Sequence, residues 1–98
     1  MILPHSFHED ARREFDEAVD FYAMESASLG LAFIEAIERA VAHVGEHPES
    51  CAVVRGRVRK MRVERFPYSV FYSFVEGAIR VIAVGHDRRR PFYWSGRR

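Results

Sequence analysis

The fold is decided by one stretch of the sequence, FPYSVFYSFVEGAIRVIAV, which spans residues 66–84. Residues 68–75 and 79–84 are rich in the β-branched and aromatic side chains that strands favour. The short segment Glu76-Gly77-Ala78 between them has the length and the glycine of a tight turn. The stretch therefore predicts an antiparallel β-hairpin.

The sequence on the N-terminal side of this hairpin predicts two more strands. Residues 58–65 alternate in character, and one side of that strand, formed by Lys60, Arg62 and Glu64, is charged throughout. Residues 2–7 begin with apolar side chains, and Pro4 restricts this segment to an edge strand.

Two helical patterns lie between the edge strand and residue 48. Apolar residues recur at steps of three and four over residues 8–24 and again over residues 28–44. We expect Ser6 to cap the first helix and the acidic residues of that helix to face outward. Gly45 and Pro48 are typical of a helix end, so the second helix should stop near Val44.

These elements predict an α+β fold in two layers, a two-helix hairpin packed on one face of a twisted antiparallel sheet. The order is an edge strand, then the helices, then three strands. The 98 residues, 48% of them hydrophobic, suit a single domain over residues 1–98. No uncharged stretch approaches the ~20 residues of a membrane span, and no secretory signal is evident. The single Cys51 agrees with a reducing compartment, so we expect a cytoplasmic protein without a membrane partner.

The formal charge of +1 conceals a strong polarity along the chain. Residues 1–50 hold eleven acidic residues and three arginines, a net charge of −8. Residues 51–98 hold twelve basic and three acidic residues, a net charge of +9. The second half is therefore suited to a polyanion or to an acidic protein.

Arginine supplies fourteen of the fifteen basic residues, and several lie beside Phe92, Tyr93 and Trp94 in the C-terminal tail. Arginine binds phosphate through its planar fork, and aromatic rings can stack on unpaired bases. RNA is one ligand that this combination favours, while an acidic protein or a merely solvated surface are the alternatives.

Three further features bear on chemistry. His86 ends the last strand beside the arginines, where it could act as a general acid or base or be satisfied by the backbone. No Gly-rich phosphate loop is present, and Gly45 and Pro48 break the helical frame that would aim His43 and His47 at one metal. We therefore expect no metal and no cofactor.

The chain resembles the RelE/ParE superfamily of bacterial type II toxins over nearly its whole length. The resemblance rests on Phe66-Pro67-Tyr68-Ser69-Val70-Phe71-Tyr72, on Ile79–Val84 and on His86-Asp87-Arg88-Arg89-Arg90-Pro91-Phe92-Tyr93-Trp94. It implies two helices on a twisted antiparallel sheet. It also implies a cognate antitoxin that wraps around the toxin in a hetero-oligomer.

The resemblance leaves the target open, because RelE-like members cut messenger RNA on the ribosome and ParE-like members inhibit DNA gyrase. For a ribosome-dependent endoribonuclease, it implies that Arg65 and Arg88 hold the scissile phosphate while His86 and Tyr93 transfer protons. The residues expected to contact the target are Arg59, Lys60, Arg62, Arg89, Arg90 and Trp94. A single lysine, Lys60, on the predicted sheet is fewer than such nucleases often carry.

The gyrase alternative assigns target binding to the helical hairpin and the tail. A third alternative is a non-toxic or degenerate member whose basic face serves only the antitoxin.

Overall fold

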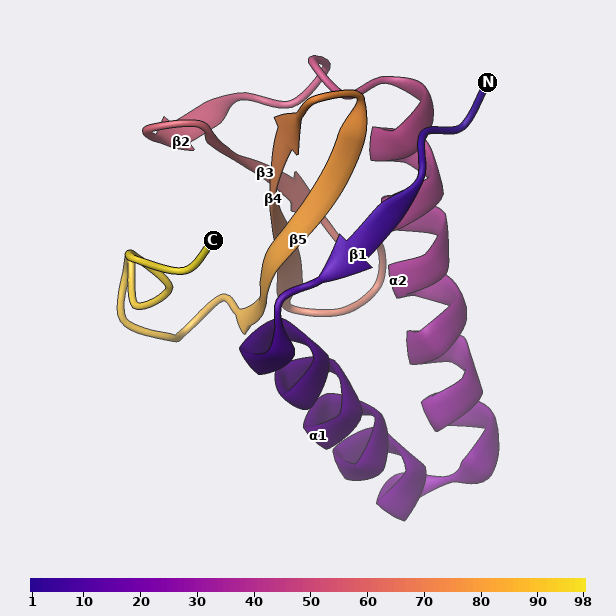
Figure 1. The fold of residues 1–98 in the computed structure, drawn as a ribbon. Coiled ribbons are helices and arrows are strands. Elements are labelled where there is room, and N and C mark those ends of the chain that lie inside the picture. The colour runs from indigo at the N-terminus through magenta and orange to yellow at the C-terminus, as the bar shows by residue number, and fades with distance from the viewer.

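The computed structural model describes residues 1–98 and contains two helices and five strands. The chain begins with β1 (His5–Phe7), followed by α1 (Glu9–Glu25) and α2 (Ala27–Glu46). The strands β2 (Val53–Arg55), β3 (Val58–Arg62), β4 (Tyr68–Val75) and β5 (Ala78–His86) follow. Both helices lie on one face of the sheet, and the C-terminal tail packs on the opposite face (Figure 1).

The sheet has the strand order β1-β5-β4-β3-β2. The predicted hairpin is confirmed as β4 and β5, which pair antiparallel from Tyr68 opposite His86 to Val75 opposite Ala78. β1 is an edge strand as expected, but it pairs with β5 in parallel, which makes the sheet mixed. β2 is an additional short strand at the opposite edge, so four strands follow the helices where three were expected.

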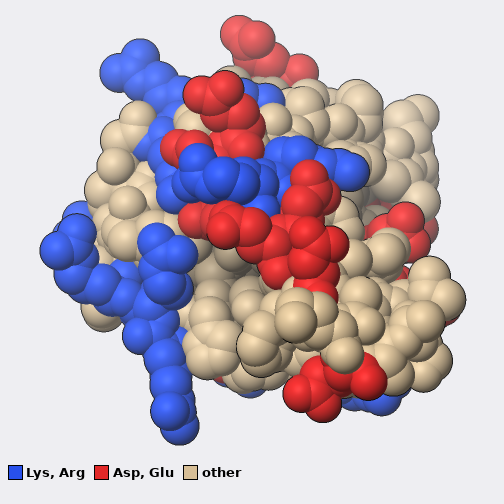
Figure 2. Space-filling model, turned by 90° about the horizontal axis from the view of Figure 1, so that it is seen from below, with Lys and Arg blue, Asp and Glu red and all other residues tan.

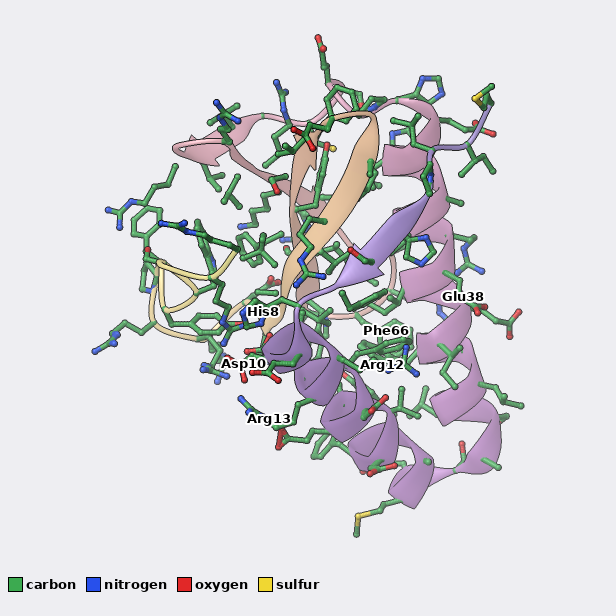
Figure 3. All side chains as sticks on the ribbon, in the orientation of Figure 1. His8, Asp10, Arg12, Arg13, Glu38 and Phe66 are labelled. Carbon is green, nitrogen blue, oxygen red and sulfur yellow. The ribbon has the colours of Figure 1, made fainter.

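The cap of α1 differs from the prediction. Ser6 lies within β1, where its hydroxyl accepts a hydrogen bond of 3.1 Å from Arg80. His8 is the N-cap instead, and its Nδ1 accepts from the backbone N–H of Asp10 at 3.0 Å. Figure 3 shows His8 and Asp10 together at this end of the helix, with Arg13 close to Asp10. The strand continues through Phe7, so the helix starts two residues later than a Ser6 cap would require.

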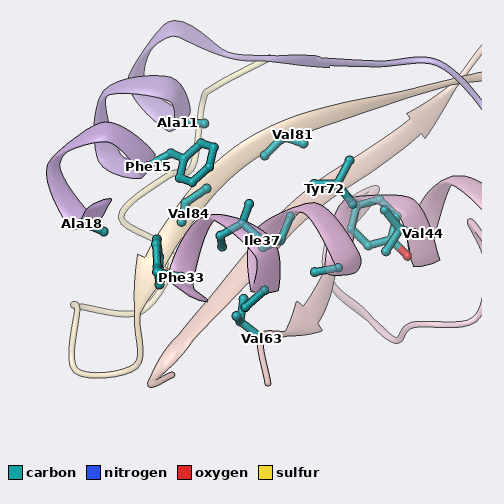
Figure 4. Packing of buried hydrophobic residues seen from close by; sticks show 14 of the residues in the cluster. Ala11, Phe15, Ala18, Phe33, Ile37, Val44, Val63, Tyr72, Val81 and Val84 are labelled. Atoms are coloured by element: carbon teal, nitrogen blue, oxygen red, sulfur yellow. The ribbon is translucent and has the colours of Figure 1, made fainter. Parts of the chain in front are cut away.

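The core lies between the helices and the sheet. α1 contributes Ala11, Phe15 and Ala18, and α2 contributes a longer apolar stripe that includes Phe33 and Ile37. These side chains pack against the inner face of the sheet, as Figure 4 shows. Neither helix has the length and apolar run that a bilayer crossing needs.

A second, smaller cluster lies on the outer face of the sheet. Ile82 and Ala83 from β5 are buried there by Trp94 from the tail, with Phe71 packed against them. The tail therefore covers part of the sheet face that the helices leave open.

Candidate functional site

The C-terminal tail, residues 87–98, encloses a cavity of about 320 Å³ against the outer face of the sheet. Lys60 of β3, Phe71 of β4 and His86 of β5 line it, together with tail residues that include Arg89 and Arg90. We call this space the tail cavity. It is the place where most of the residues expected to contact a target come together.

A buried ion pair fastens the tail to α1. The two Nη atoms of Arg97 donate to the two carboxylate oxygens of Glu14 at 3.0 Å each. Glu14 also accepts from the backbone N–H of Val84 at 3.1 Å, and Arg97 donates to the carbonyl of Ile82 at 3.1 Å. Burial lowers the pKa of Arg97, but the hydrogen bond and charge of Glu14 outweigh burial and raise that pKa, so Arg97 stays charged.

Glu14 is therefore not on the outer face of α1, where its acidic character had placed it. Only 8% of the residue is exposed. A signal for this was present, because Glu14 stands three residues after Ala11 and four before Ala18, on the apolar stripe of the helix. Nothing in the sequence of the tail identifies Arg97 as its partner.

Tyr93 lies in the same buried region. Its hydroxyl is buried without a well-aligned hydrogen-bond partner, and the guanidinium of Arg89 lies 3.8 Å from the centre of its ring. Burial, and then the negative charge of Glu14, raise the pKa of Tyr93 well above its ordinary value of about 10. A tyrosine in this environment keeps its proton. Its hydroxyl, the group that would transfer the proton, is buried away from solvent.

Trp94 is only 3% exposed. Its ring packs near the ring of Phe71, and the two centroids are 5.1 Å apart. The ring of Phe92 is also close, with a centroid distance of 5.8 Å. The structure thus places Trp94 beneath the tail as a packing residue, whereas stacking on a base requires an open ring face.

His86 lines the tail cavity at the end of β5. Its Nδ1 accepts a hydrogen bond of 3.0 Å from the backbone N–H of Arg88, and its ring packs edge-on against Tyr68. With Nδ1 occupied as an acceptor, the neutral imidazole carries its proton on Nε2.

The other expected site residues are scattered. Arg65 lies in the loop between β3 and β4, beside a hollow lined by Glu25 and Ser26 at the junction of the helices. Arg59 donates to the carbonyls of Glu49 and Cys51, so it fixes the segment before β2.

Arg62 and Arg88 lie next to the tail cavity without lining it. The side chain of Arg62 is exposed and reaches Asp87 at 3.4 Å. Arg88 contributes its backbone N–H to His86. No group of three or more His, Cys, Asp or Glu side chains is arranged to hold a metal ion.

Comparisons with known proteins show first a shared fold and then the family. A solved structure described as the chromosomal ParDE TA system from P. aeruginosa has a TM-score of 0.74 with this chain. The similarity covers 87% of this chain and 96% of that chain at 17% identity, so it shows the fold. The shared fold is the one described above, with two helices packed on one face of a five-stranded sheet.

The family follows from the sequence itself. The family described as "ParE toxin of type II toxin-antitoxin system, parDE" matches residues 6–91. The chain belongs to this family of ParE toxins. A comparison with curated protein sequences finds no match. Membership in the family implies that an antitoxin is a partner of this chain.

Proposed function

We propose that this chain is the toxin of a toxin-antitoxin pair and that it arrests growth by binding and inhibiting DNA gyrase. In this proposal the antitoxin neutralises the toxin by covering its surface, and no RNA is cleaved. The match to the ParE family over residues 6–91 supports the gyrase target over the ribosome.

The observation that carries the proposal is the environment of Tyr93. A ribosome-dependent nuclease of the kind weighed above needs Tyr93 to exchange a proton with its substrate. The hydroxyl is buried, and burial together with Glu14 raises its pKa, so both geometry and protonation oppose that role. Arg65, expected to hold the scissile phosphate, lines the hollow at the helix junction and does not line the tail cavity.

A conservative substitution tests this proposal in cells. We expect Tyr93→Phe to arrest growth as strongly as the native toxin when each is induced without antitoxin. The variant loses only a buried hydroxyl that has no well-aligned hydrogen-bond partner. Growth curves measure the effect, and immunoblots confirm equal protein levels.

Loss of toxicity in Tyr93→Phe, with an unchanged circular dichroism spectrum, would contradict the proposal and favour the nuclease. Tyr68→Phe is the matched control, because Tyr68 is another partly buried tyrosine whose pKa is raised by burial.

A further inference from the structure

We propose that the tail cavity is a binding site for a phosphate group. This inference goes beyond the proposed function, because it does not depend on gyrase being the target. Three cations line the cavity, Lys60 from β3 and Arg89 and Arg90 from the tail. One acidic residue, Asp87, also lines it, and that carboxylate is paired with Arg62. The cavity therefore holds a net positive charge.

Apart from the carboxylate of Asp87, the charged side chains around the cavity are donors. The Nδ1 atom of His86 already accepts from the Arg88 N–H, so it is not free to accept from a ligand. Lysine and arginine side chains have donors and no acceptors. A ligand for this site must therefore bring several acceptor oxygens and negative charge, as a phosphate group does.

The aromatic residues of the tail serve the site in another way. The guanidinium of Arg89 lies 3.8 Å from the ring centre of Tyr93, and that of Arg55 lies 3.8 Å from the ring centre of Phe92. These ring faces are occupied by cations, and Trp94 is buried. Stacking a base in the cavity is disfavoured, whereas an arginine held flat on a ring keeps the N–H groups at its edge for an anion.

The tail can pack closely on β5 because residue 85 is a glycine. A Cβ atom added to Gly85 would lie 2.7 Å from the Tyr93 hydroxyl and 3.3 Å from the Phe71 ring. The absence of a side chain there lets Tyr93 pack on β5, which brings Arg89 to the cavity wall. A volume of about 320 Å³ accommodates a phosphate together with part of the molecule that bears it.

Nuclear magnetic resonance on the full-length ¹⁵N-labelled protein tests the proposal. Inorganic phosphate, adenosine 5′-monophosphate and acetate are titrated separately at neutral pH and constant ionic strength. We expect saturable shifts at residues 85–94 and Lys60 with both phosphate ligands and not with acetate. Tighter binding of the nucleotide would identify a phosphate ester as the natural source, and equal binding would identify the phosphate group alone.

Matched charge variants complete the test. We expect Lys60→Gln to weaken phosphate binding about tenfold, the effect of losing one charge-assisted hydrogen bond. Arg57→Gln removes one charge from the exposed turn beside β3, outside the cavity, and should leave binding within about twofold. Arg90→Gln repeats the measurement should Lys60→Gln disturb the fold.

Three results would overturn the proposal. They are shifts that rise linearly without saturation, acetate shifts as large as those with phosphate, and equal weakening by Lys60→Gln and Arg57→Gln.

Discussion

At the scale of single residues, the pair formed by Glu14 and Arg97 decides how the C-terminal tail is held. The side chains are 7% and 13% exposed, and each has a second partner on β5. A buried pair adds little net stability, but removing one partner leaves a buried charge uncompensated. The tail, its arginines and the tail cavity thus depend on two residues that sequence reasoning did not single out.

This contact predicts a large effect for a substitution near the end of the chain. We expect Arg97→Ala to lower the free energy of unfolding by about 3 kcal/mol or more, because Glu14 is left buried without its cation. Urea denaturation followed by circular dichroism measures the loss. Trypsin should also cut faster after Arg88 and Arg89, since the tail is released.

The control is Arg13→Ala, which breaks an exposed pair with Asp10 on the same helix. That variant should lose about 1 kcal/mol at most. The interpretation fails if Arg97→Ala costs no more than Arg13→Ala.

At the scale of elements, α1 and α2 approach each other closely at Gly30. A Cβ atom added there would lie 2.9 Å from the Cβ of Ala23 and 3.1 Å from its Cα. Neither atom is the end of a flexible side chain, so the helices would have to separate. Gly30 sets how tightly α1 and α2 can close, and thereby how they meet the sheet.

We expect Gly30→Ala to destabilise the protein by about 1–3 kcal/mol through overpacking, despite a gain in helix propensity of about 1 kcal/mol. Thermal and urea unfolding measure the difference. Ala23→Gly removes the opposing Cβ, so the double variant should be more stable than the sum of the two single effects predicts. Simple additivity of the two substitutions would argue against a contact between these positions.

The elements also differ in how far the sequence predicts them. Both helices carry periodic apolar patterns, and β4 and β5 are rich in β-branched and aromatic residues, so these four elements were predicted with bounds close to those observed. β2 has three residues, all exposed, so it has no alternation to detect. The parallel pairing of β1 with β5 depends on where the helices return the chain to the sheet. No local sequence pattern contains that information.

The candidate site was predicted less completely for a related reason. The basic and aromatic composition of the tail predicted a site in this region, and Lys60, His86, Arg89 and Arg90 line one cavity there. The burial of Trp94 follows from the need to cover Ile82 and Ala83 on the outer face of the sheet. That need is a property of the assembled sheet, because the tail has no periodicity of its own.

At the scale of the whole molecule, the polarity of charge along the sequence becomes a polarity in space. Figure 2 shows acidic side chains gathered over the middle of the face seen from below, and basic side chains extending from one side. Part of the negative charge of α1 is paired with arginines of the same helix, as in the exposed ion pair of Arg12 with Asp16. The excess positive charge remains with the sheet and tail, where a target or an antitoxin carrying negative charge would be attracted.

The four tyrosines predict how the whole fold responds to alkali. Burial is the main cause that raises the pKa of Tyr22, Tyr68, Tyr72 and Tyr93. Because each pKa is higher in the folded chain than in the unfolded chain, stability is fully present below about pH 10 and falls as the pH rises further. We expect urea midpoints to decline above that pH.

Tyrosinate absorbance provides the accompanying measurement. It should rise together with unfolding and not before it, whereas the chain in denaturing urea should titrate near pH 10. Tyrosines that ionise near pH 10 in the folded protein would contradict the burial described here.

The central claim is that this ParE toxin acts by binding gyrase, and one measurement with purified components tests it most directly. Gyrase and relaxed plasmid are incubated with increasing amounts of toxin, and supercoiling is followed on agarose gels. In a parallel sample the toxin is added to translating ribosomes, and cleavage of the messenger RNA is followed. The account predicts that toxin in excess abolishes supercoiling while the message stays intact. Normal supercoiling at toxin excess, with message cut on the ribosome, would contradict it.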